Sequence, residues 1–484
     1  MARPKFVQIP PHRLDRFKPL LGEDYGRVEA AAARARDLFE GRAIWHVSST
    51  LRGGGVAEML RSLLPYVRGA GVDTRWVVLR ERAEFFELTK RLHNNLHGDP
   101  GDGGALGATQ RDLYEDTLAA SARHLSPLLQ AGDVVFLHDP QTAGLAPAAK
   151  AAGASVVWRC HIGADRPDEI ARRAWDFLAP YVRAADAFVF SRREYLWEVL
   201  DRERAWVMAP CIDPFSPKNQ ELEPATVEEV LGVIGLGPEP PTLVPTFIRA
   251  DGTPGRVERQ AEILQDENLP KRALVVAQVS RWDRLKDHRG LLACFHRHLG
   301  GENLHLVLAG PATAAVADDP EGASVWREVG RDWHELPAEV RRRVHLVCLP
   351  MDDLDENAAM VNALQRRADI VVQKSLAEGF GLTVAEAMWK RRPVIGTRVG
   401  GIQDQIVDRV SGVLVDDPRD LDRLAKAILA LTEDRRGAAE MGEQAHRRVL
   451  ERFLAANRLV EYIDLLARDL RTSVNGLPSV GLSI

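Results

Sequence analysis

Residues 378–388 read E-G-F-G-L-T-V-A-E-A-M, a glycine loop that runs directly into a predicted helix. Gly379 and Gly381 allow the backbone to approach a ligand closely and to adopt positive φ angles. The helix that we expect from Leu382 onward turns its unpaired N–H groups and its positive dipole end towards that ligand. This arrangement suits a diphosphate, so the stretch predicts a nucleotide-binding loop on an α/β sheet.

Two glutamates lie eight positions apart in this stretch. Glu386 on the helix can accept two hydroxyl hydrogen bonds, as a ribose requires. Glu378, which precedes the loop, can reach the hydroxyl groups of a sugar. The alternative interpretation is an ordinary glycine turn before a helix, with two solvated glutamates.

A basic motif, V-S-R-W-D-R-L-K-D, occupies residues 279–287 and follows a strand predicted at 274–279. Arg281 and Lys286 would lie where the strand meets its loop and could brace two phosphates from one side. Positive charge there stabilises a nucleoside diphosphate as it leaves. Taken alone, such a pair is as often a solvated loop, but beside Glu378 it favours a phosphate site.

Short apolar runs alternate with helical patterns along the whole chain. A strand predicted at 43–47 leads into three glycines at 53–55 and a helix at 56–67, which is the start of a βαβ unit. Further strands are predicted at 76–79, 134–137, 155–158, 187–190, 274–279, 305–308, 344–349, 370–372, 394–395 and 413–415. The alternation predicts the α/β class, with parallel sheets covered by helices.

The length of 484 residues indicates two domains. A proline-rich segment separates two rounds of alternation, so we predict a Rossmann-like acceptor domain at 1–212 and a Rossmann-like donor domain at 213–452, with a linker at 213–270. The helical end at 453–484 is expected to return to the first domain. Two such domains facing each other predict a cleft in which two ligands meet.

The composition narrows the classes of partner. Basic residues number 64 and acidic residues 69, and no block of Lys or Arg resembles a nucleic-acid footprint. No stretch approaches the roughly 18 apolar residues that span a bilayer. The four scattered cysteines and the absence of a signal-like start predict a cytoplasmic protein. The glycines at 53–55 lack the G-x-G-x-x-G spacing that a dinucleotide-dependent oxidoreductase would need.

Polar residues near the ends of the first domain's strands are candidates for sugar contacts. His161 follows the strand at 155–158, although a lone histidine is more often structural. The candidates for the acceptor are His138, Asp139, Gln141, Lys90 and Asn94. Each could instead belong to an ordinary turn or an exposed helix face. The acidic run at 352–356 is expected to cap a helix, and no metal site is predicted.

Taken together, S-R-x-x-x-x-K and E-G-F-G-L-T-x-x-E resemble the donor domain of retaining glycosyltransferases of the glycogen-synthase and sucrose-synthase type, which have the GT-B fold. The resemblance implies that Arg281 and Lys286 contact the diphosphate, that Glu378 faces the donor sugar, and that Glu386 holds the ribose. It places His161 against the sugar's hydroxymethyl group. It further implies donor contacts from the two glycine loops, through Gly54, Gly55, Gly379, Phe380, Gly381, Leu382 and Thr383.

A narrower resemblance links residues from about 15 to about 450 with the trehalose glycosyltransferring synthases. The segments that carry it are 48–58, 85–98, 138–141, 158–162, 212–219, 318–322 and 361–366. Two places depart from the family. Gly163 follows His161 and Ile162 where an aspartate is expected, and the stretch 233–268 is longer than expected, which puts the identity of the acceptor in question.

The resemblance implies a reversible transfer of glucose from an NDP-glucose to glucose, giving α,α-trehalose with retention. UDP-, ADP- and GDP-glucose are equal candidates for the donor. No cofactor is expected, no motif indicates Mg²⁺, and a homodimer without nucleic-acid or membrane partners is implied. The alternatives are a phosphorylase that uses inorganic phosphate, a transferase with another acceptor, and a nucleotide-sugar-binding protein without catalysis.

Overall fold

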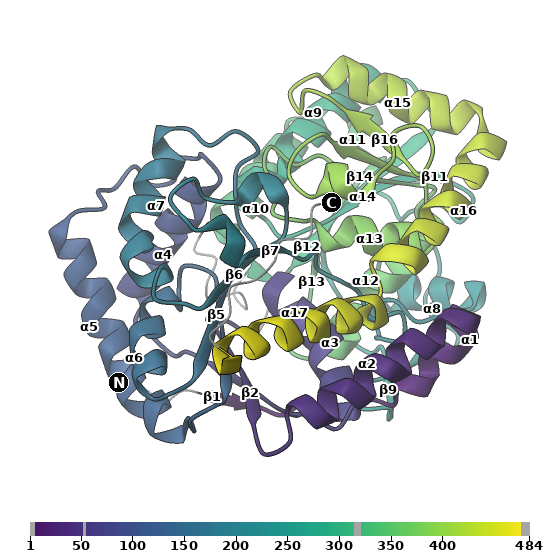
Figure 1. The fold of residues 1–484 in the computed structure, drawn as a ribbon. Helices are drawn as coiled ribbons and strands as arrows, with labels where there is room; N and C mark the ends of the chain where they lie inside the picture. The colour runs from purple at the N-terminus through teal and green to yellow at the C-terminus, as the bar shows by residue number, and fades with distance from the viewer. Residues whose placement is uncertain (1–4, 52–54, 314–320, 476–484) are drawn as a thin grey trace. The chain divides into compact units, whose positions relative to one another are not determined.

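The computed structural model describes residues 5–51, 55–313 and 321–475, with the backbone alone at 469–475. The chain divides into two compact units. The N-terminal unit comprises residues 1–211 and 453–484, and the C-terminal unit comprises residues 212–452. Each unit is a mixed α/β structure built on a mainly parallel sheet, and the fold is the predicted GT-B fold (Figure 1).

The sheet of the N-terminal unit has the strand order β1-β3-β2-β4-β5-β6-β7. Only β1 is antiparallel to its neighbour among the described strands of this sheet. The strands are β1 Lys5–Val7, β2 Ala43–Ser48, β3 Asp73–Val78, β4 Val134–His138, β5 Ser155–Cys160, β6 Ala187–Phe190 and β7 Ala205–Val207. The α-helices are α1 Lys18–Leu21, α2 Tyr25–Leu38, α3 Gly55–Gly69, α4 Ala83–Leu96, α5 Ala108–Leu125, α6 Ala146–Ala151, α7 Glu169–Val182 and α17 Ala455–Asn475.

The C-terminal unit repeats this plan with the order β10-β13-β12-β11-β14-β15-β16, and here β10 is the antiparallel edge strand. The strands are β8 Thr246–Ile248, β9 Pro254–Arg256, β10 Glu262–Leu264, β11 Leu274–Val279, β12 Leu304–Pro311, β13 Val344–Leu349, β14 Ile370–Gln373, β15 Val394–Thr397 and β16 Val413–Val415. The α-helices are α8 Pro224–Ile234, α9 His288–Leu299, α10 Gly322–His334, α11 Ala338–Arg341, α12 Leu354–Arg367, α13 Leu382–Trp389, α14 Ile402–Gln405, α15 Leu421–Glu433 and α16 Arg435–Arg452.

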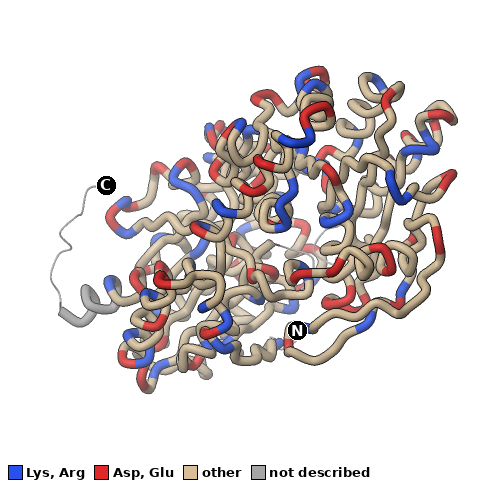
Figure 2. The backbone as a smooth tube through the Cα atoms, turned by 90° about the vertical axis from the view of Figure 1, so that its right-hand side faces the viewer, with Lys and Arg blue, Asp and Glu red and all other residues tan. Residues whose placement is uncertain are grey.

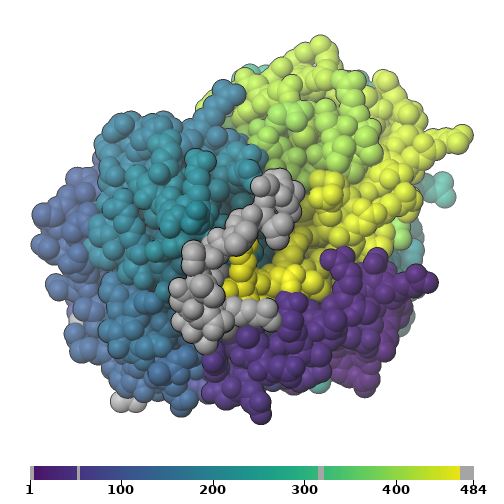
Figure 3. All heavy atoms as spheres, in the orientation of Figure 1, coloured from purple at the N-terminus to yellow at the C-terminus, as the bar shows by residue number. Residues whose placement is uncertain are grey.

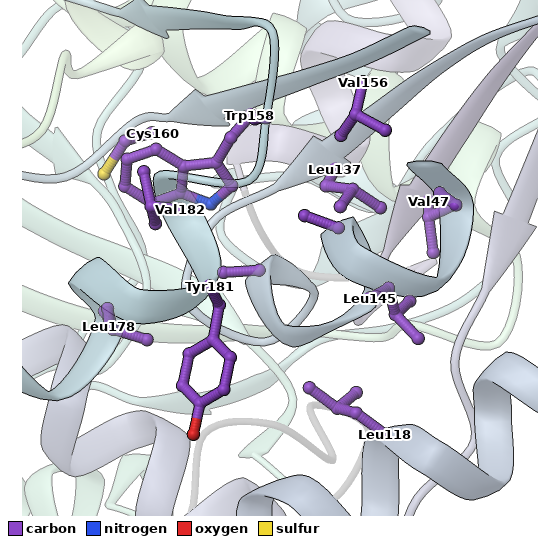
Figure 4. Close-up of a cluster of buried hydrophobic side chains, with 14 of the residues drawn as sticks. Val47, Leu118, Leu137, Leu145, Val156, Trp158, Cys160, Leu178, Tyr181 and Val182 are labelled. Atoms are coloured by element: carbon purple, nitrogen blue, oxygen red, sulfur yellow. The ribbon is translucent and has the colours of Figure 1, made fainter. Parts of the chain in front are cut away.

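The central strands are apolar on both faces because helices cover both sides of each sheet. Figure 4 shows part of this core in the N-terminal unit, where apolar side chains of β4, β5, α5 and α7 converge. The predicted strands and the helix at 56–67 are confirmed, with ends that differ by a few residues. The edge strands β1, β7 and β10 are too short to carry a clear alternation, and we did not predict them.

Both sheets contain a topological switch point. In the N-terminal unit the chain places β3 on one side of β2 and β4 on the other, and in the C-terminal unit it places β12 and β14 on opposite sides of β11. In open α/β sheets such a point, at the carboxyl edge between strands whose loops diverge, is where ligands bind.

The segment expected to be a proline-rich linker forms part of the C-terminal unit. It contributes α8, the hairpin β8–β9 and the edge strand β10. Arg249 pairs with Asp353 at 2.7 Å, and Arg259 pairs with the buried Glu356. The acidic run therefore caps α12, as predicted, and also anchors the long insertion.

The last helix, α17, packs against α2 and α3 of the N-terminal unit. In Figure 3 the yellow C-terminal segment lies beside the purple N-terminal helices. Figure 2 shows Lys and Arg interspersed with Asp and Glu along the backbone of both units. No helix in the described part of the chain is long and apolar enough to cross a bilayer.

A buried carboxylate links β2 to the segment that precedes β4. Asp133 accepts hydrogen bonds from Ala43 N at 2.9 Å, Trp45 Nε1 at 2.9 Å and Gln130 N at 3.0 Å.

Asp133→Ala should therefore lower the unfolding free energy by about 3 kcal/mol, since buried donors lose a charged acceptor. Urea unfolding followed by tryptophan fluorescence would measure this, with the exposed Asp116→Ala as a control. Equal midpoints for the two variants would show that Asp133 is not a stabilising contact.

Candidate functional site

The predicted donor residues lie on both sides of the switch point in the C-terminal unit. Lys286 follows β11, Glu378 follows β14, and the Lys286 Nζ to Glu378 Oε2 distance is 2.5 Å. The Lys286 and Glu378 side chains are 14% and 10% exposed. Ser375 Oγ also donates to Glu378 Oε2 at 3.2 Å. The structure thus brings together a cation and a carboxylate that are 92 residues apart in sequence.

Buried polar side chains hold Lys286 in place. Gln278 on β11 donates to the Lys286 carbonyl at 2.8 Å and accepts from Lys374 N at 3.0 Å. The Lys374 ammonium group is buried and pairs with Asp287, whose φ of 49° lies in the left-handed region. Asp287 in turn caps α9 through Gly290 N. Sequence reasoning missed this support, because Gln278 and Lys374 lie within apolar strand patterns.

Of the two glycines in the loop, Gly381 has the predicted positive φ and Gly379 does not. Gly381 has a φ of 82° and is the residue at the N-cap of α13. Gly401 N donates to the Gly379 carbonyl at 3.1 Å, and Gln405 Nε2 donates to the Phe380 carbonyl at 2.6 Å. The backbone of residues 379–381 is thus fixed from behind, while the N-terminal end of α13 offers N–H groups to an anion.

Glu386 lies on α13 and its side chain is 3% exposed. The Lys218 ammonium group lies 3.6 Å from Glu386 Oε1. Lys390 Nζ donates to the Glu386 carbonyl at 3.1 Å and to Gln365 Oε1 at 2.8 Å. Burial lowers the pKa of Lys390 well below its ordinary value, and Glu386 opposes that shift. Lys218 belongs to a segment that carried the family resemblance, which is the signal that could have identified it.

Arg281, the remaining predicted phosphate ligand, is about a quarter exposed and lies 3.5 Å from Asp283. Thr383 and Leu382 begin α13, where the Thr383 hydroxyl donates to Gln373 Oε1 at 2.9 Å. The residues predicted to hold a diphosphate therefore share one edge of the sheet with the glycine loop.

In the N-terminal unit, three histidines form a line at the switch point. His46 Nδ1 lies 3.0 Å from His138 Nε2, and His138 Nδ1 lies 3.2 Å from His161 Nε2. His46 Nε2 lies 2.9 Å from the hydroxyl of Tyr462 on α17. Both ring nitrogens of His138 are thus engaged, and the ring is 1% exposed. Contact between His138 and an acceptor stays a prediction that this geometry does not favour.

Burial keeps these histidines neutral. It lowers the pKa of His46 to about 3, and the nearby Arg159 charge acts in the same direction. It also lowers the pKa values of His138 and His161 well below the ordinary value. A protonated imidazole here would lack water and would face a buried guanidinium.

Asp139 follows β4 with a φ of 60°, and its Oδ1 accepts from His161 N at 2.7 Å. Burial raises the pKa of Asp139 to about 7, while the bond from His161 N and the Arg159 charge oppose the shift. The carboxyl group therefore fixes the backbone beside His161. The bond to His161 N thus gives Asp139 a structural role that does not require contact with a sugar.

The other acceptor candidates lie near this edge. Lys90 and Asn94 are half-buried on α4, and His97, just after that helix, contacts the Gly163 carbonyl through Nδ1 at 3.0 Å. Gln141 is half-buried after β4. Gly53 and Gly54 lie outside the described residues, and Gly55 begins α3. Acceptor contacts by Lys90, Asn94 and Gln141 stay predictions.

The chemistry of the C-terminal edge suits a phosphorylated sugar. A lysine, an arginine and a helix N-terminus can neutralise phosphate oxygens, and carboxylates can accept hydrogen bonds from sugar hydroxyls. In the described residues, no group of three or more His, Cys, Asp or Glu side chains is placed to hold a metal ion.

Known proteins share this plan. The family described as trehalose synthase, N-terminal domain, matches residues 46–197, and the glycosyl transferases group 1 family matches residues 259–448. A trehalose synthase of Pyrococcus horikoshii is 33% identical over 461 residues, which cover 94% of this chain and 96% of that protein. The chain belongs to the trehalose synthase family of group 1 glycosyltransferases.

Other relatives extend the comparison. A trehalose phosphorylase of Pleurotus pulmonarius is 26% identical over 465 residues, covering 90% of this chain and 58% of that protein. The crystal structure of an α,α-trehalose 6-phosphate synthase from Burkholderia multivorans has a TM-score of 0.64 at 15% identity. It covers 91% of this chain and 100% of that structure, and at this identity it supports the GT-B fold alone.

The support behind the glycine loop can be tested at Gly401. A Cβ atom there would lie 2.6 Å from Phe380 Cα and 3.0 Å from the Gly379 carbonyl oxygen. Gly401→Ala should displace the loop and weaken binding of a nucleoside diphosphate about tenfold or more. Calorimetric titration with UDP, ADP and GDP would measure this effect. Gly301→Ala, with open space around its Cβ, is the matched control. Unchanged affinity in Gly401→Ala would separate the loop from the binding site.

The buried histidines predict an acid-sensitive fold. A histidine with a depressed pKa gains a proton only on unfolding, so its contribution to stability is full above about pH 6.5 and falls towards pH 3. Asp139 has the opposite effect on stability between about pH 4 and pH 7. Its raised pKa keeps the carboxyl group protonated in the folded state, so unfolding releases a proton and stability falls as the pH rises. The thermal midpoint should fall from pH 7 to pH 5, and His46→Gln should reduce that fall by removing one histidine. The exposed His124→Gln is the control. An unaltered pH slope in His46→Gln would contradict the assignment.

Proposed function

We propose that the protein transfers glucose from an α-linked NDP-glucose to the anomeric hydroxyl of glucose, with retention, to form α,α-trehalose. The observation that carries the proposal is the Lys286–Glu378 ion pair across the switch point of the C-terminal unit, beside the glycine loop that begins α13. The Pyrococcus horikoshii relative is named a trehalose synthase, which supports this product.

Donor binding would exchange one partner of Lys286 for another. Without a ligand, its ammonium group is satisfied by Glu378. A diphosphate carries more negative charge than one carboxylate and would attract Lys286, so that Glu378 becomes available to the sugar hydroxyls. The same side chains can thus be paired at rest and still serve the substrate without an unpaired buried charge.

Glu386 is the proposed ribose contact. Its carboxyl group is buried on α13, and the Lys218 ammonium group lies 3.6 Å from its Oε1. An ionised carboxylate can accept hydrogen bonds from both hydroxyls of a ribose. A phosphorylase that uses inorganic phosphate would have no need for this contact, so Glu386 favours a nucleotide donor.

In the proposed reaction, Arg281, Lys286 and the N-terminal end of α13 stabilise the departing nucleoside diphosphate. The bond from C1 of the donor glucose to the phosphate oxygen breaks, and the acceptor oxygen bonds to C1 from the same face. The acceptor proton passes to the departing phosphate oxygen. The reaction is proposed to be reversible, because the acetal bond that forms between the two glucose units replaces a comparable activated bond from glucose to phosphate.

The test combines the purified protein with free glucose and each of UDP-, ADP- and GDP-glucose, followed by proton NMR. We expect the anomeric signal of α,α-trehalose with one or more donors. Arg281→Ala should lower kcat about 100-fold, since it removes a stabilising charge from the transition state. Arg284→Ala is the matched control, because Arg284 lies close to Arg281 in sequence, is more than half exposed and pairs with Glu328 on α10.

Other outcomes identify the alternatives. Glucose 1-phosphate formed from trehalose and phosphate without nucleotide would indicate a phosphorylase. Donor binding without formation of a disaccharide from glucose would indicate another acceptor. Hydrolysis of the donor, or transfer of its glucose to another sugar, would then identify that acceptor. Binding without any turnover would indicate a nucleotide-sugar-binding protein. A homodimer, and the absence of a required cofactor, stay predictions.

A further inference from the structure

The line of histidines in the N-terminal unit continues into the C-terminal helix. Tyr462, His46, His138 and His161 are joined by contacts of 2.9, 3.0 and 3.2 Å. Neighbouring rings are inclined by only 24°, 25° and 14°, so their planes are nearly parallel, and the short contacts join atoms at the ring edges. The four residues come from α17, β2, β4 and the loop after β5.

Each histidine in this line carries a single ring proton, because burial favours the neutral form. In a neutral imidazole one nitrogen donates and the other accepts. A proton on one nitrogen of His46 therefore decides which nitrogen of His138 is free to donate, and His138 decides the same for His161. The tautomers of the three rings are coupled, and only two directions of donation satisfy all the contacts.

Tyr462 selects between the two directions. Its side chain is fully buried, and among the described residues its hydroxyl contacts His46 alone. If His46 donated to that hydroxyl, the buried O–H would have no acceptor, which is unfavourable. The hydroxyl therefore donates to His46 Nε2, His46 Nδ1–H donates to His138 Nε2, and His138 Nδ1–H donates to His161 Nε2.

The line ends at a residue that is less buried than His46 and His138. His161 is only half-buried, and its backbone N–H is held by Asp139 at the carboxyl edge of the sheet. Because His161 Nε2 accepts, the ring proton is on Nδ1. That nitrogen has no hydrogen-bond partner among the described residues.

We propose that Tyr462, acting through His46 and His138, fixes the tautomer of His161 so that its Nδ1–H donates a hydrogen bond to a hydroxyl oxygen of the bound sugar. The identity of the ligand as a sugar rests on the proposed function. Tyr462, His46 and His138 are positioning residues, and His161 is the residue that touches the substrate. The C-terminal helix thereby acts on the site through a side chain that never contacts the sugar.

The experiment uses the full-length protein labelled with ¹⁵N-histidine and long-range ¹H–¹⁵N NMR, which distinguishes the two neutral tautomers. The signals of His161 are assigned by their loss in His161→Gln. In the wild type, His161 should be protonated at Nδ1. In Tyr462→Phe, the selecting donor is lost, so the His161 signals should move towards those of the other tautomer, and kcat for disaccharide formation should fall about threefold to tenfold.

Two controls separate this effect from general packing. Tyr181→Phe removes the hydroxyl of another buried tyrosine of the same unit, one that donates to Glu115, and should leave His161 unchanged. At position 46, Gln can accept from Tyr462 with its carbonyl and donate to His138 with its amide, whereas Leu can do neither. His46→Gln should therefore retain the His161 tautomer and most activity, and His46→Leu should lose both.

The inference is overturned if wild-type His161 is protonated at Nε2, or if its signals are the same in Tyr462→Phe, His46→Leu and the wild type. If Tyr462→Phe does not fold, the two variants at position 46 decide the matter. The spectrum reports the tautomer with or without turnover. A protein that makes no trehalose but shows the expected tautomers would therefore refute the proposed function and leave the coupling of the rings intact.

Discussion

A parallel sheet in which the chain leaves its first strand towards one side, and later returns to the other, necessarily opens a crevice at its carboxyl edge. Both units of this protein are built around such a point, at β2 and β4 in one and at β11 and β14 in the other. The crevice places the ends of two central strands side by side. Residues from distant parts of the chain can therefore meet there, and in each unit the candidate site residues lie at this position.

Polar groups at the ends of central strands carry a free-energy cost, because burial largely removes them from water. The C-terminal unit meets it with pairs of opposite charge: Lys286 with Glu378, and Lys374 with Asp287. The N-terminal unit offsets this cost with neutral imidazole rings that hydrogen-bond to one another, since burial and the Arg159 charge disfavour the protonated form. Charge suits a phosphorylated ligand, and neutral donors and acceptors suit the hydroxyl groups of a sugar.

Sequence patterns predicted the helices and strands, but not which distant side chains contact one another. The strand at 274–279 and the helix at 382–389 follow from local apolar periodicity and a glycine turn, and both were found. His138 is predicted to contact a sugar because it ends a strand, and that contact stays a prediction; only the structure shows that both of its ring nitrogens contact other histidines. The long insertion at 233–268 departs from the family in sequence, and only the structure shows that it attaches to the N-terminal end of α12 through Arg249 and Arg259.

The sequence alone determined the fold class, the family and the glycine turn before α13, because these depend on residues close together in the chain or on short fixed spacings. Only the tertiary structure decided which buried polar groups meet. Tyr462 and His46 are 416 positions apart, and nothing local to either residue indicates the other. A buried donor must find an acceptor somewhere, but the topology of the folded chain alone decides which acceptor is within reach.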